Sequence, residues 1–355
     1  MAKNVTVNKT NECVDIKRIL LETPPESPLL KWIALTEAVG IIILNTVLIL
    51  MLMRLKKKSR MAYFVKHLSI ADLFVGLLYV LPNCIFERFL EKWEKYSCFI
   101  FYGYCTNVTI FASTFLIVVL TIDRLFVIVR PLSASTKGNR YRYGLVSGAW
   151  MLALILTIPY ALHIRFSDTC TEHGINICWH DFKHMEAIVL AEFFINWIIP
   201  VCIIISCYTW IIRVIIRREK FGLPGSPNTI FSHGTTTFLG NGLNVQTSST
   251  SVITTAKKKT IKLSLAVVIV YIASWTPINL AQVLNVFGII PAGDLFTVLH
   301  VFAPINNLMN PLVFLVFNRQ LGKITNKDVG NNVLCCVKRS NNIFDTSKYN
   351  ASSNS

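Results

Sequence analysis

The chain has 355 residues, of which 53% are hydrophobic and only 15% are charged. Soluble domains carry roughly 25% charged residues, so this composition excludes an ordinary soluble protein and indicates an integral membrane protein. The net charge of +16 would fit a nucleic-acid-binding protein, but the basic residues lie in short clusters beside apolar runs. That distribution is typical of membrane topology signals, and we expect no nucleic-acid partner.

The N-terminal segment, residues 1–31, is polar, and its prolines, the last of them Pro28, are expected to break any helix. It lacks the apolar core of a cleavable signal peptide, so the first apolar run is expected to serve as an uncleaved anchor. Asn4 and Asn8 each begin an Asn-X-Thr glycosylation sequon. Together these features predict an extracellular, glycosylated tail.

Seven apolar runs follow, each close to the roughly 20 residues that a helix needs to cross a bilayer. They lie at about 32–55, 64–86, 98–124, 144–164, 187–216, 260–287 and 295–317. The predicted fold class is therefore an all-α membrane protein. It consists of a seven-transmembrane-helix bundle over 32–317, followed by a cytoplasmic helix and a flexible tail over 318–355.

The asymmetry of charge predicts the orientation of the bundle. The connection 54–60 carries five basic residues, the 124–142 region and both flanks of the 219–256 connection are also basic, and the alternate connections are balanced or acidic. Because basic loops stay in the cytosol, the N-terminus is expected outside the cell in a multi-pass plasma-membrane protein. The 219–256 connection is rich in Ser, Thr, Gly and Asn and is predicted to be a flexible cytoplasmic loop.

The C-terminal part turns from apolar to basic after Pro311, which predicts a short amphipathic helix on the inner lipid surface. Cys335 and Cys336 follow at a distance at which acylation would attach the tail to the membrane; the alternative is a pair of free cytosolic thiols. The last residues include several Ser and Thr and are predicted to be flexible and open to phosphorylation.

Ten cysteines are present, and most lie in the apolar runs. Disulfides are expected on an oxidising extracellular side. Cys98, at the outer start of the third run, and Cys178, in the connection after the fourth, form the preferred pair, which would draw that connection over the mouth of the bundle. Cys13 and Cys170 form a candidate second bridge, and the sequence alone does not fix the connectivity.

The third run contains the pair Asp123–Arg124 near its end. Charges inside hydrocarbon cost on the order of 2.5–3.5 kcal/mol each at mid-bilayer, so the pair is expected to face the bundle. One interpretation is an ion pair that ends and orients the helix, and the other is a conformational switch. Tyr208, on the fifth run near the same face, is expected to meet Arg124 when the sixth helix moves.

Asp72 lies in the middle of the second run, and an intramembrane acid is a functional candidate by default. Ser113, Asn306, Asn307 and Asn310 lie at depths from which they can face it. A carboxylate with several neutral oxygen ligands suits a small monovalent cation, so a sodium site of Asp72, Ser113, Asn306 and Asn310 is predicted. The alternative is a hydrogen-bonded cluster that packs three helices together.

Two proline motifs indicate hinges. Trp275 and Pro277 place a bulky indole beside a kink in the sixth run, so a ligand that presses on the ring would turn the inner half of the helix. Ordinary core packing of the indole is the alternative. Asn310 and Pro311 supply a second kink in the seventh run.

No enzyme signature is found in the sequence, whether a Ser/His/Asp order, a phosphate loop or an HExxH motif. The Cys and His spacing indicates no metal site, and His163, His173, His180 and His184 are interpreted as polar loop residues rather than zinc ligands. We therefore expect neither an enzyme nor a cofactor, apart from the allosteric sodium ion.

Taken together, these residues resemble the rhodopsin-like (class A) G-protein-coupled receptors over about 30–330. The markers are Asn45, Leu68-Ser69-Ile70-Ala71-Asp72, Cys98, Asp123-Arg124, Trp150, Pro200 with Tyr208, Trp275 with Pro277, and Asn310-Pro311. The resemblance implies a cell-surface receptor that activates heterotrimeric G proteins by outward movement of helix six. Arrestin and receptor kinases are further implied partners.

Within that class the chain resembles the vasopressin/oxytocin neuropeptide receptors. The carriers are the stretches SRM at 59–61, FVKHLS at 64–69, VLP at 80–82 and CW at 178–179, together with Tyr271, Trp275-Thr276-Pro277 and Gln282. The resemblance implies a polar cavity that holds a small disulfide-closed peptide amide. The ligand-binding residues that it implies are Asn83, Glu87, Thr106, Trp179, Gln282 and Tyr79.

Some positions depart from the family. Tyr79, Gly103, Thr106 and Tyr160 stand where the family has glutamine or lysine, which favours a changed peptide. Leu125 follows Asp123-Arg124 in place of tyrosine, Phe314 ends the Asn-Pro motif in place of tyrosine, and Cys98 lies one residue further from Arg124 than in the family, which predicts a local bulge.

Rival functions have weaker support. An amine receptor needs a carboxylate where Thr106 stands, an opsin needs a lysine within 295–317, and a transporter would show an internal repeat. The sequence therefore favours a neuropeptide receptor of the vasopressin/oxytocin type. The alternatives are a receptor for a different neuropeptide and a non-signalling decoy.

Overall fold

The computed structural model describes residues 27–55, 59–136, 139–167, 176–220, 249–291 and 293–317. Several predicted features lie outside the described residues and stay predictions. They are the sequons at Asn4 and Asn8, the bridge Cys13–Cys170, the lipidation sites Cys335 and Cys336, and the amphipathic helix after residue 317.

Nearly all of the described chain is helical. The elements in chain order are α2 (Pro28–Arg54), α3 (Arg60–Val75), η1 (Gly76–Val80), α4 (Leu81–Asn83), η2 (Cys84–Phe89), α5 (Lys95–Ser97), η3 (Cys98–Cys105), α6 (Thr106–Val129), α7 (Pro131–Thr136), α8 (Asn139–Leu162), β1 (Ile164–Ser167), β2 (Ile177–His180), α9 (Met185–Glu192), η4 (Phe193–Ile198), α10 (Ile199–Lys220), α11 (Ser249–Val286), α12 (Asp294–Phe302) and α13 (Ile305–Phe317). The η segments are π-helical turns within longer helices.

Seven helical stretches in the described part of the chain are long and apolar enough to cross a membrane. They are called the first to seventh spans and run over Pro28–Arg54, Arg60–Phe89, Lys95–Val129, Arg140–Leu162, Met185–Arg217, Ile261–Val286 and Leu295–Val316. The predicted seven-helix organisation is thus confirmed. The largest difference in a boundary is at the end of the third span, which reaches Val129 rather than Arg124.

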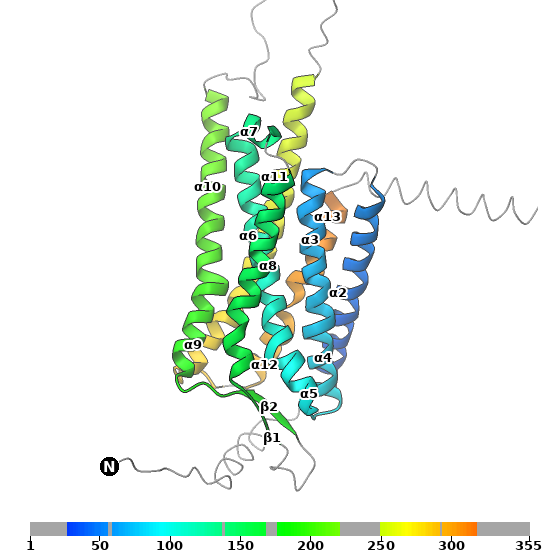
Figure 1. Cartoon of the computed structure of the whole chain (residues 1–355), viewed down its shortest axis with the longest axis vertical. Helices are drawn as coiled ribbons and strands as arrows, with labels where there is room; N and C mark the ends of the chain where they lie inside the picture. The colour runs from blue at the N-terminus through cyan, green and yellow to red at the C-terminus, as the bar shows by residue number, and fades with distance from the viewer. Residues whose placement is uncertain are drawn as a thin grey trace, which may run out of the picture. The chain divides into compact units, whose positions relative to one another are not determined.

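The chain divides into two compact units, one up to Pro311 and one from Leu312 onward. Within the first unit, the third span is the most enclosed. In its most apolar stretch 72% is buried, against 17% in the corresponding stretch of the fifth span. Large apolar side chains such as Trp210 and Ile212 stay exposed on the outside, as expected of surfaces that face lipid. Figure 1 shows β1 and β2 at one end of this unit, near α5, and α7 at the other; we call these the strand end and the α7 end.

Serine caps explain where two spans begin. Ser27 Oγ accepts from the N–H of Leu30 at 3.4 Å, and Ser59 Oγ accepts from that of Ala62 at 3.1 Å. Each cap satisfies an N–H group that a helix start leaves unpaired. The expectation that Pro28 breaks a helix is wrong, because it occupies the first helical position, where no intrahelical hydrogen bond is lost.

The predicted flexible loop 219–256 is wrong at its C-terminal end, because α11 already begins at Ser249. Extending a helix by one residue costs little once its nucleus has formed. The sixth helix therefore begins before the start of its apolar run.

The π-helical segments gather in the halves of the spans that lie toward the strand end. They interrupt the second span (η1 and η2), the third (η3) and the fifth (η4). A π-helical turn accommodates an additional residue within an α-helix and frequently marks a functional site. Because η3 lies between Cys98 and Arg124, it confirms the local bulge predicted from the longer spacing of these residues.

Candidate functional site

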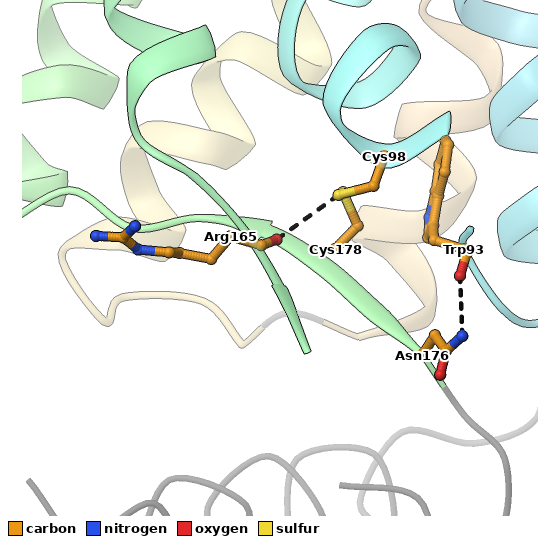
Figure 2. The surroundings of a disulfide bond; sticks show 5 residues. All are labelled: Trp93, Cys98, Arg165, Asn176 and Cys178. Atoms are coloured by element: carbon orange, nitrogen blue, oxygen red, sulfur yellow. Dashed lines mark hydrogen bonds between the residues drawn. A yellow bond between two sulfur atoms is a disulfide. The ribbon is translucent and has the colours of Figure 1, made fainter. Parts of the chain in front are cut away.

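A short hairpin is tied to the strand end of the bundle. β1 and β2 pair antiparallel with Phe166 opposite Cys178, and Cys178 forms a disulfide with Cys98 across 5.8 Å between Cα atoms, which confirms the predicted pair. Figure 2 shows a second attachment, in which the Asn176 amide donates to the Trp93 carbonyl at 3.2 Å. The backbone N–H of Trp93 donates in turn to the backbone carbonyl of Asn176 at 3.3 Å. The hairpin is therefore fixed at two places, to the start of the third span through Cys98 and to the connection before that span through Trp93.

An open cavity of about 350 Å³ lies beside this hairpin. Its lining comes from the second, third, fifth, sixth and seventh spans and from β2: Tyr79, Asn83, Glu87, Arg88, Tyr102, Thr106, Asn107, Ile110, His180, Glu192, Gln282, Phe296, Thr297 and His300. A larger hollow on the outer face of α10 is lined by that helix alone. Polar side chains from several elements therefore converge only in the first of these two hollows.

Five of the six residues predicted to bind ligand line this cavity: Tyr79, Asn83, Glu87, Thr106 and Gln282. Trp179 does not. Side chains alternate between the two faces of a strand, and its neighbour in β2, His180, is the residue that reaches the cavity. In the structure His180, and not Trp179, lines the cavity, and a role of Trp179 in ligand binding stays a prediction.

Several lining residues have no part in the sequence-based prediction, notably Tyr102, Glu192 and His300. Tyr102 precedes Thr106 by one helical turn, so helical spacing was a usable signal for it. Glu192 ends α9 directly before the π-helical turn η4. No sequence pattern indicates on which side of the helix such a residue lies, because the π turn changes the rotation.

The cavity carries a concentration of acidic groups. Tyr79 lies within electrostatic range of three carboxylates, Glu37, Glu87 and Glu192. The carboxylate of Glu192 accepts a hydrogen bond from the Tyr160 hydroxyl. The carboxylates come from the first, second and fifth spans, so the acidic character surrounds Tyr79.

Glu37 lies in a side chamber of about 20 Å³ between the first, second and seventh spans. The chamber shares Tyr79, Asn83, Arg88 and His300 with the main cavity. The Glu37 side chain is buried, and its Oε1 has no hydrogen-bond partner among the described residues. A chamber of this volume holds about one water molecule.

His180 belongs to a column of aromatic rings at the strand end. Its ring stacks on Tyr102 at 5.1 Å and on Phe182 at 5.9 Å, and Phe182 stacks on His163 at 4.7 Å. The pKa of His180 is lowered to about 4, mainly by burial and also by the nearby His163, while a hydrogen bond with the Gly103 backbone acts in the opposite direction. The imidazole of His180 is therefore neutral at pH 7.

A buried polar network surrounds Asp72 in the middle of the bundle. The Ser113 hydroxyl donates to Asp72 Oδ1 at 2.6 Å, and Asn310 Nδ2 donates to Oδ2 at 2.9 Å. Ser113 also lies 3.1 Å from Asn307 Oδ1, and Asn45 Nδ2 donates to the Asn307 carbonyl at 3.0 Å. The structure thus brings together Asp72, Ser113 and Asn310 as predicted, with Asn307 in the place predicted for its neighbour on the helix.

At the α7 end, Asp123 is fully buried and contacts two arginines. Arg124 donates to Asp123 Oδ2 at 2.6 Å, and Arg60 Nε donates to Oδ1 at 2.7 Å. Arg60 also donates to the Ala134 carbonyl at 2.8 Å. Tyr208 is buried and lies in electrostatic range of Arg124. The predicted pair therefore exists, and Arg60 is the partner that sequence analysis did not assign.

The helix α11 runs from the cavity, which Gln282 lines, into the interior of the bundle. Pro277 lies inside this helix, and Trp275 beside it is buried. Asn279 Nδ2 donates to the Trp275 carbonyl at 2.8 Å, and the Tyr271 hydroxyl donates to the Asn196 carbonyl of η4 at 2.6 Å. Such bonds satisfy carbonyl groups beside prolines and π turns, and the Tyr271 bond couples α11 with the π-helical turn of the fifth span.

Comparison with known proteins places this arrangement in a family. The family model "7 transmembrane receptor (rhodopsin family)" matches residues 44–314. The chain belongs to the rhodopsin family of seven-transmembrane receptors. The match spans the polar network, the Asp123–Arg124 pair and the whole cavity lining, so these features lie within the receptor fold.

Among curated members of the rhodopsin family, the chain is similar to three receptors with peptide-derived names. It is 28% identical to the vasopressin V1b receptor of Mus musculus, over 75% of this chain and 66% of that receptor. It is 29% identical to cephalotocin receptor 2 of Octopus vulgaris, over 77% and 65%, and 30% identical to the isotocin receptor of Catostomus commersonii, over 79% and 70%. The chain thus spans about two thirds of the length of these relatives.

Proposed function

We propose that this rhodopsin-family member is a cell-surface receptor for a neuropeptide of the vasopressin/oxytocin type and activates heterotrimeric G proteins. The observation that carries the proposal is the convergence of Asn83, Thr106 and Gln282 in one open cavity. Amide and hydroxyl groups both donate and accept hydrogen bonds, which suits the unpaired N–H and C=O groups of a short peptide. The names of the three relatives point to the same class of ligand.

The strand end faces the extracellular side in this proposal. The Cys98–Cys178 disulfide lies at that end, and disulfides persist in oxidising surroundings. Arg54 and Arg60, which border the connection between the first two spans, lie at the opposite end, and the positive-inside rule assigns such residues to the cytosol. The N-terminal tail is then extracellular and the protein resides in the plasma membrane.

Activation is a shift between two conformations, of which the peptide binds one more tightly. Gln282 contacts the peptide on the same helix that carries Pro277 and Trp275, so the contact changes the angle of α11 about the proline. Helix six then moves outward at the α7 end, and Arg124 leaves Asp123. The cleft that opens beside Arg124 and Tyr208 receives a helix of the G protein.

We also propose that Asp72 binds an allosteric sodium ion in the inactive conformation. The residues fit the ion, because the Asp72 carboxylate and the Ser113 hydroxyl are oxygen ligands, and the buried Oδ1 of Asn310 has no hydrogen-bond partner among the described residues. Sodium should weaken agonist binding to the wild type and leave binding to Asp72→Asn unchanged. Equal sodium sensitivity of both proteins would remove the ion from this site.

The test of the receptor function is calcium and cyclic-AMP signalling in cells that express the chain. The cells are challenged with disulfide-closed nonapeptide amides and with amidated linear neuropeptides, and cells that lack the chain are the control. A response to the cyclic peptides supports the proposal. A response to linear peptides alone assigns a different neuropeptide.

A non-signalling decoy is the second candidate, and Leu125 after Asp123-Arg124 is the observation that favours it. In that case peptide binds at the surface and no G protein responds.

Recruitment of arrestin, phosphorylation by a receptor kinase and lipid attachment at Cys335 and Cys336 complete the proposed set of partners. Arrestin recruitment without a G-protein signal would separate a biased receptor from a decoy.

A further inference from the structure

The cavity presents hydrogen-bond acceptors that no described side chain satisfies. Asn83 is only 7% exposed, and its Oδ1 has no partner; the Oγ1 of Thr106 is also without a partner in the described structure. Both residues line the main cavity. Because a buried acceptor without a donor costs about 1–3 kcal/mol, a bound group that brings several N–H donors is favoured here.

The charge of the cavity points to the same kind of group. Glu87 and Glu192 line it, and among the described lining residues the one side chain with a permanent positive charge is Arg88. Arg88 acts electrostatically on His300 of the seventh span. His180 is neutral at pH 7, as described above. On the wall formed by the fifth span, the acidic residue is Glu192, and the side chain described as acting on its carboxylate is the Tyr160 hydroxyl, which carries no charge.

We infer that the cavity binds a cationic group of the peptide, a guanidinium or an ammonium, and that Glu192 is the residue that selects for this charge. The inference rests on the proposed peptide-receptor function and adds the chemistry of one ligand group. It also assigns a specificity-determining role to a residue that the resemblance to the vasopressin/oxytocin receptors does not include.

Volume and exposure distinguish Glu192 from the two other carboxylates. The side chamber at Glu37 has room for about one water molecule, so the end of an arginine or lysine side chain does not fit there. Glu87 lies in the last turn before the strand-end connection and is exposed, where water and salt weaken a charge–charge contact. Glu192 is half-buried and therefore gives the strongest contact.

Tyr160 fixes the carboxylate in position for this role. Its hydroxyl donates to Glu192, and its ring contacts His180 at 5.6 Å and Phe182 at 5.7 Å. An ionised carboxylate has about four acceptor positions, so the bond from Tyr160 leaves acceptors for a bidentate ligand group. Tyr160 is thus a positioning residue that acts through Glu192.

A double-mutant cycle between receptor and peptide tests the inference. The probes are a disulfide-closed nonapeptide amide that contains one arginine, its citrulline analogue, and an analogue without the N-terminal amine. Competition binding is measured on membranes with the wild type, Glu192→Gln and Glu192→Asp. Glu186→Gln is the matched control, because Glu186 lies exposed in the first turn of the same helix.

The wild type should prefer the arginine peptide over citrulline, or the amine over its deaminated analogue, by about 10- to 100-fold, as expected for a hydrogen bond between charged groups. The analogue that loses affinity identifies the source of the charge. Glu192→Gln should abolish the preference, whereas Glu192→Asp and Glu186→Gln should keep it.

Three results would overturn the inference. A wild type that binds the peptides without a preference for charge rejects it and leaves the peptide-receptor function standing. A preference that survives in Glu192→Gln but disappears in Glu87→Gln moves the selecting charge to the second span. A wild type at the cell surface that binds none of the peptides rejects both the inference and the proposed function. The comparison of peptides on the wild type needs no mutant to fold.

Discussion

Arg60 Nε donates to Oδ1 of Asp123 at 2.7 Å, across an interface between the second and third spans. The guanidinium of Arg60 also lies 5.7 Å from the Phe126 ring and 5.5 Å from the Tyr141 ring. One buried carboxylate therefore pairs with two arginines, one on its own helix and one on a neighbouring helix. This arrangement ties the start of the second span to the end of the third span in the conformation observed.

Asp123→Asn should raise basal signalling by several-fold. The neutral amide keeps the shape of the carboxylate but removes its attraction for Arg124, and removing one partner of a buried ion pair is strongly destabilising. Basal calcium and cyclic-AMP levels, normalised to surface expression, measure the effect. Asp181→Asn is the control, because its ion pair with Arg165 is exposed on both sides and contributes little. Unchanged basal activity of well-expressed Asp123→Asn would contradict a lock at this pair.

Arg60→Gln should also raise basal signalling, because it removes the bond that ties the second span to the third span. The rise should be smaller than in Asp123→Asn, because Arg124 still holds the carboxylate. The two substitutions should be non-additive, since residues that share a charge partner couple by roughly 0.5–3 kcal/mol. Basal signalling of both single mutants and of the double mutant gives the coupling. Strict additivity would mean that Arg60 acts through the Ala134 carbonyl or the aromatic rings instead of through Asp123.

Composition and charge were sufficient to predict the seven spans, because apolar length and basic flanks are properties of the sequence itself. The importance of Asp72 and Asp123 could also be predicted from the sequence, since an acid in an apolar run needs a partner wherever the helices pack. That of Arg60, His180 and Glu192 could not. Their roles depend on helix rotation, strand phase and π-helical turns, which shift a side chain by a large angle without a local sequence signal.

Tyr271→Phe should lower the thermal stability of the purified protein. The hydroxyl donates to the Asn196 carbonyl at 2.6 Å, and Tyr271 is 1% exposed, so its removal leaves a buried acceptor unpaired at a cost of about 1–3 kcal/mol. Melting temperatures in detergent measure the loss. Tyr143→Phe is the matched control, because Tyr143 is 54% exposed and its hydroxyl can bind water. Equal melting temperatures of both mutants would argue against a coupling of α11 with η4.

His180 should make the stability of the strand end depend on pH. Its pKa is lowered to about 4 in the folded protein, from an ordinary value of 6.5, so between these values the unfolded chain binds more protons than the folded one. Stability is then complete above pH 6.5 and decreases as the pH falls toward 4, by about 1 kcal/mol per pH unit. Melting at pH 7 and pH 5 should show a smaller difference in His180→Gln than in the wild type. His184→Gln, at an exposed position, is the control, and the same pH dependence in all three proteins would exclude His180 as its source.

Gln282→Ala should weaken peptide potency by about tenfold and leave surface expression intact. Gln282 lines the cavity one to two turns beyond Pro277 on α11, so it is the side chain through which a bound peptide reaches the kinked helix. Loss of one or two net hydrogen bonds, each worth roughly 0.5–1.5 kcal/mol, accounts for this magnitude. Dose–response curves for the peptide that activates the wild type measure the shift. Leu280→Ala, two residues earlier and 50% exposed on the outer face, should show no shift. Unchanged potency of Gln282→Ala would remove this residue from the binding site, and an equal loss in both mutants would assign the effect to the stability of the helix.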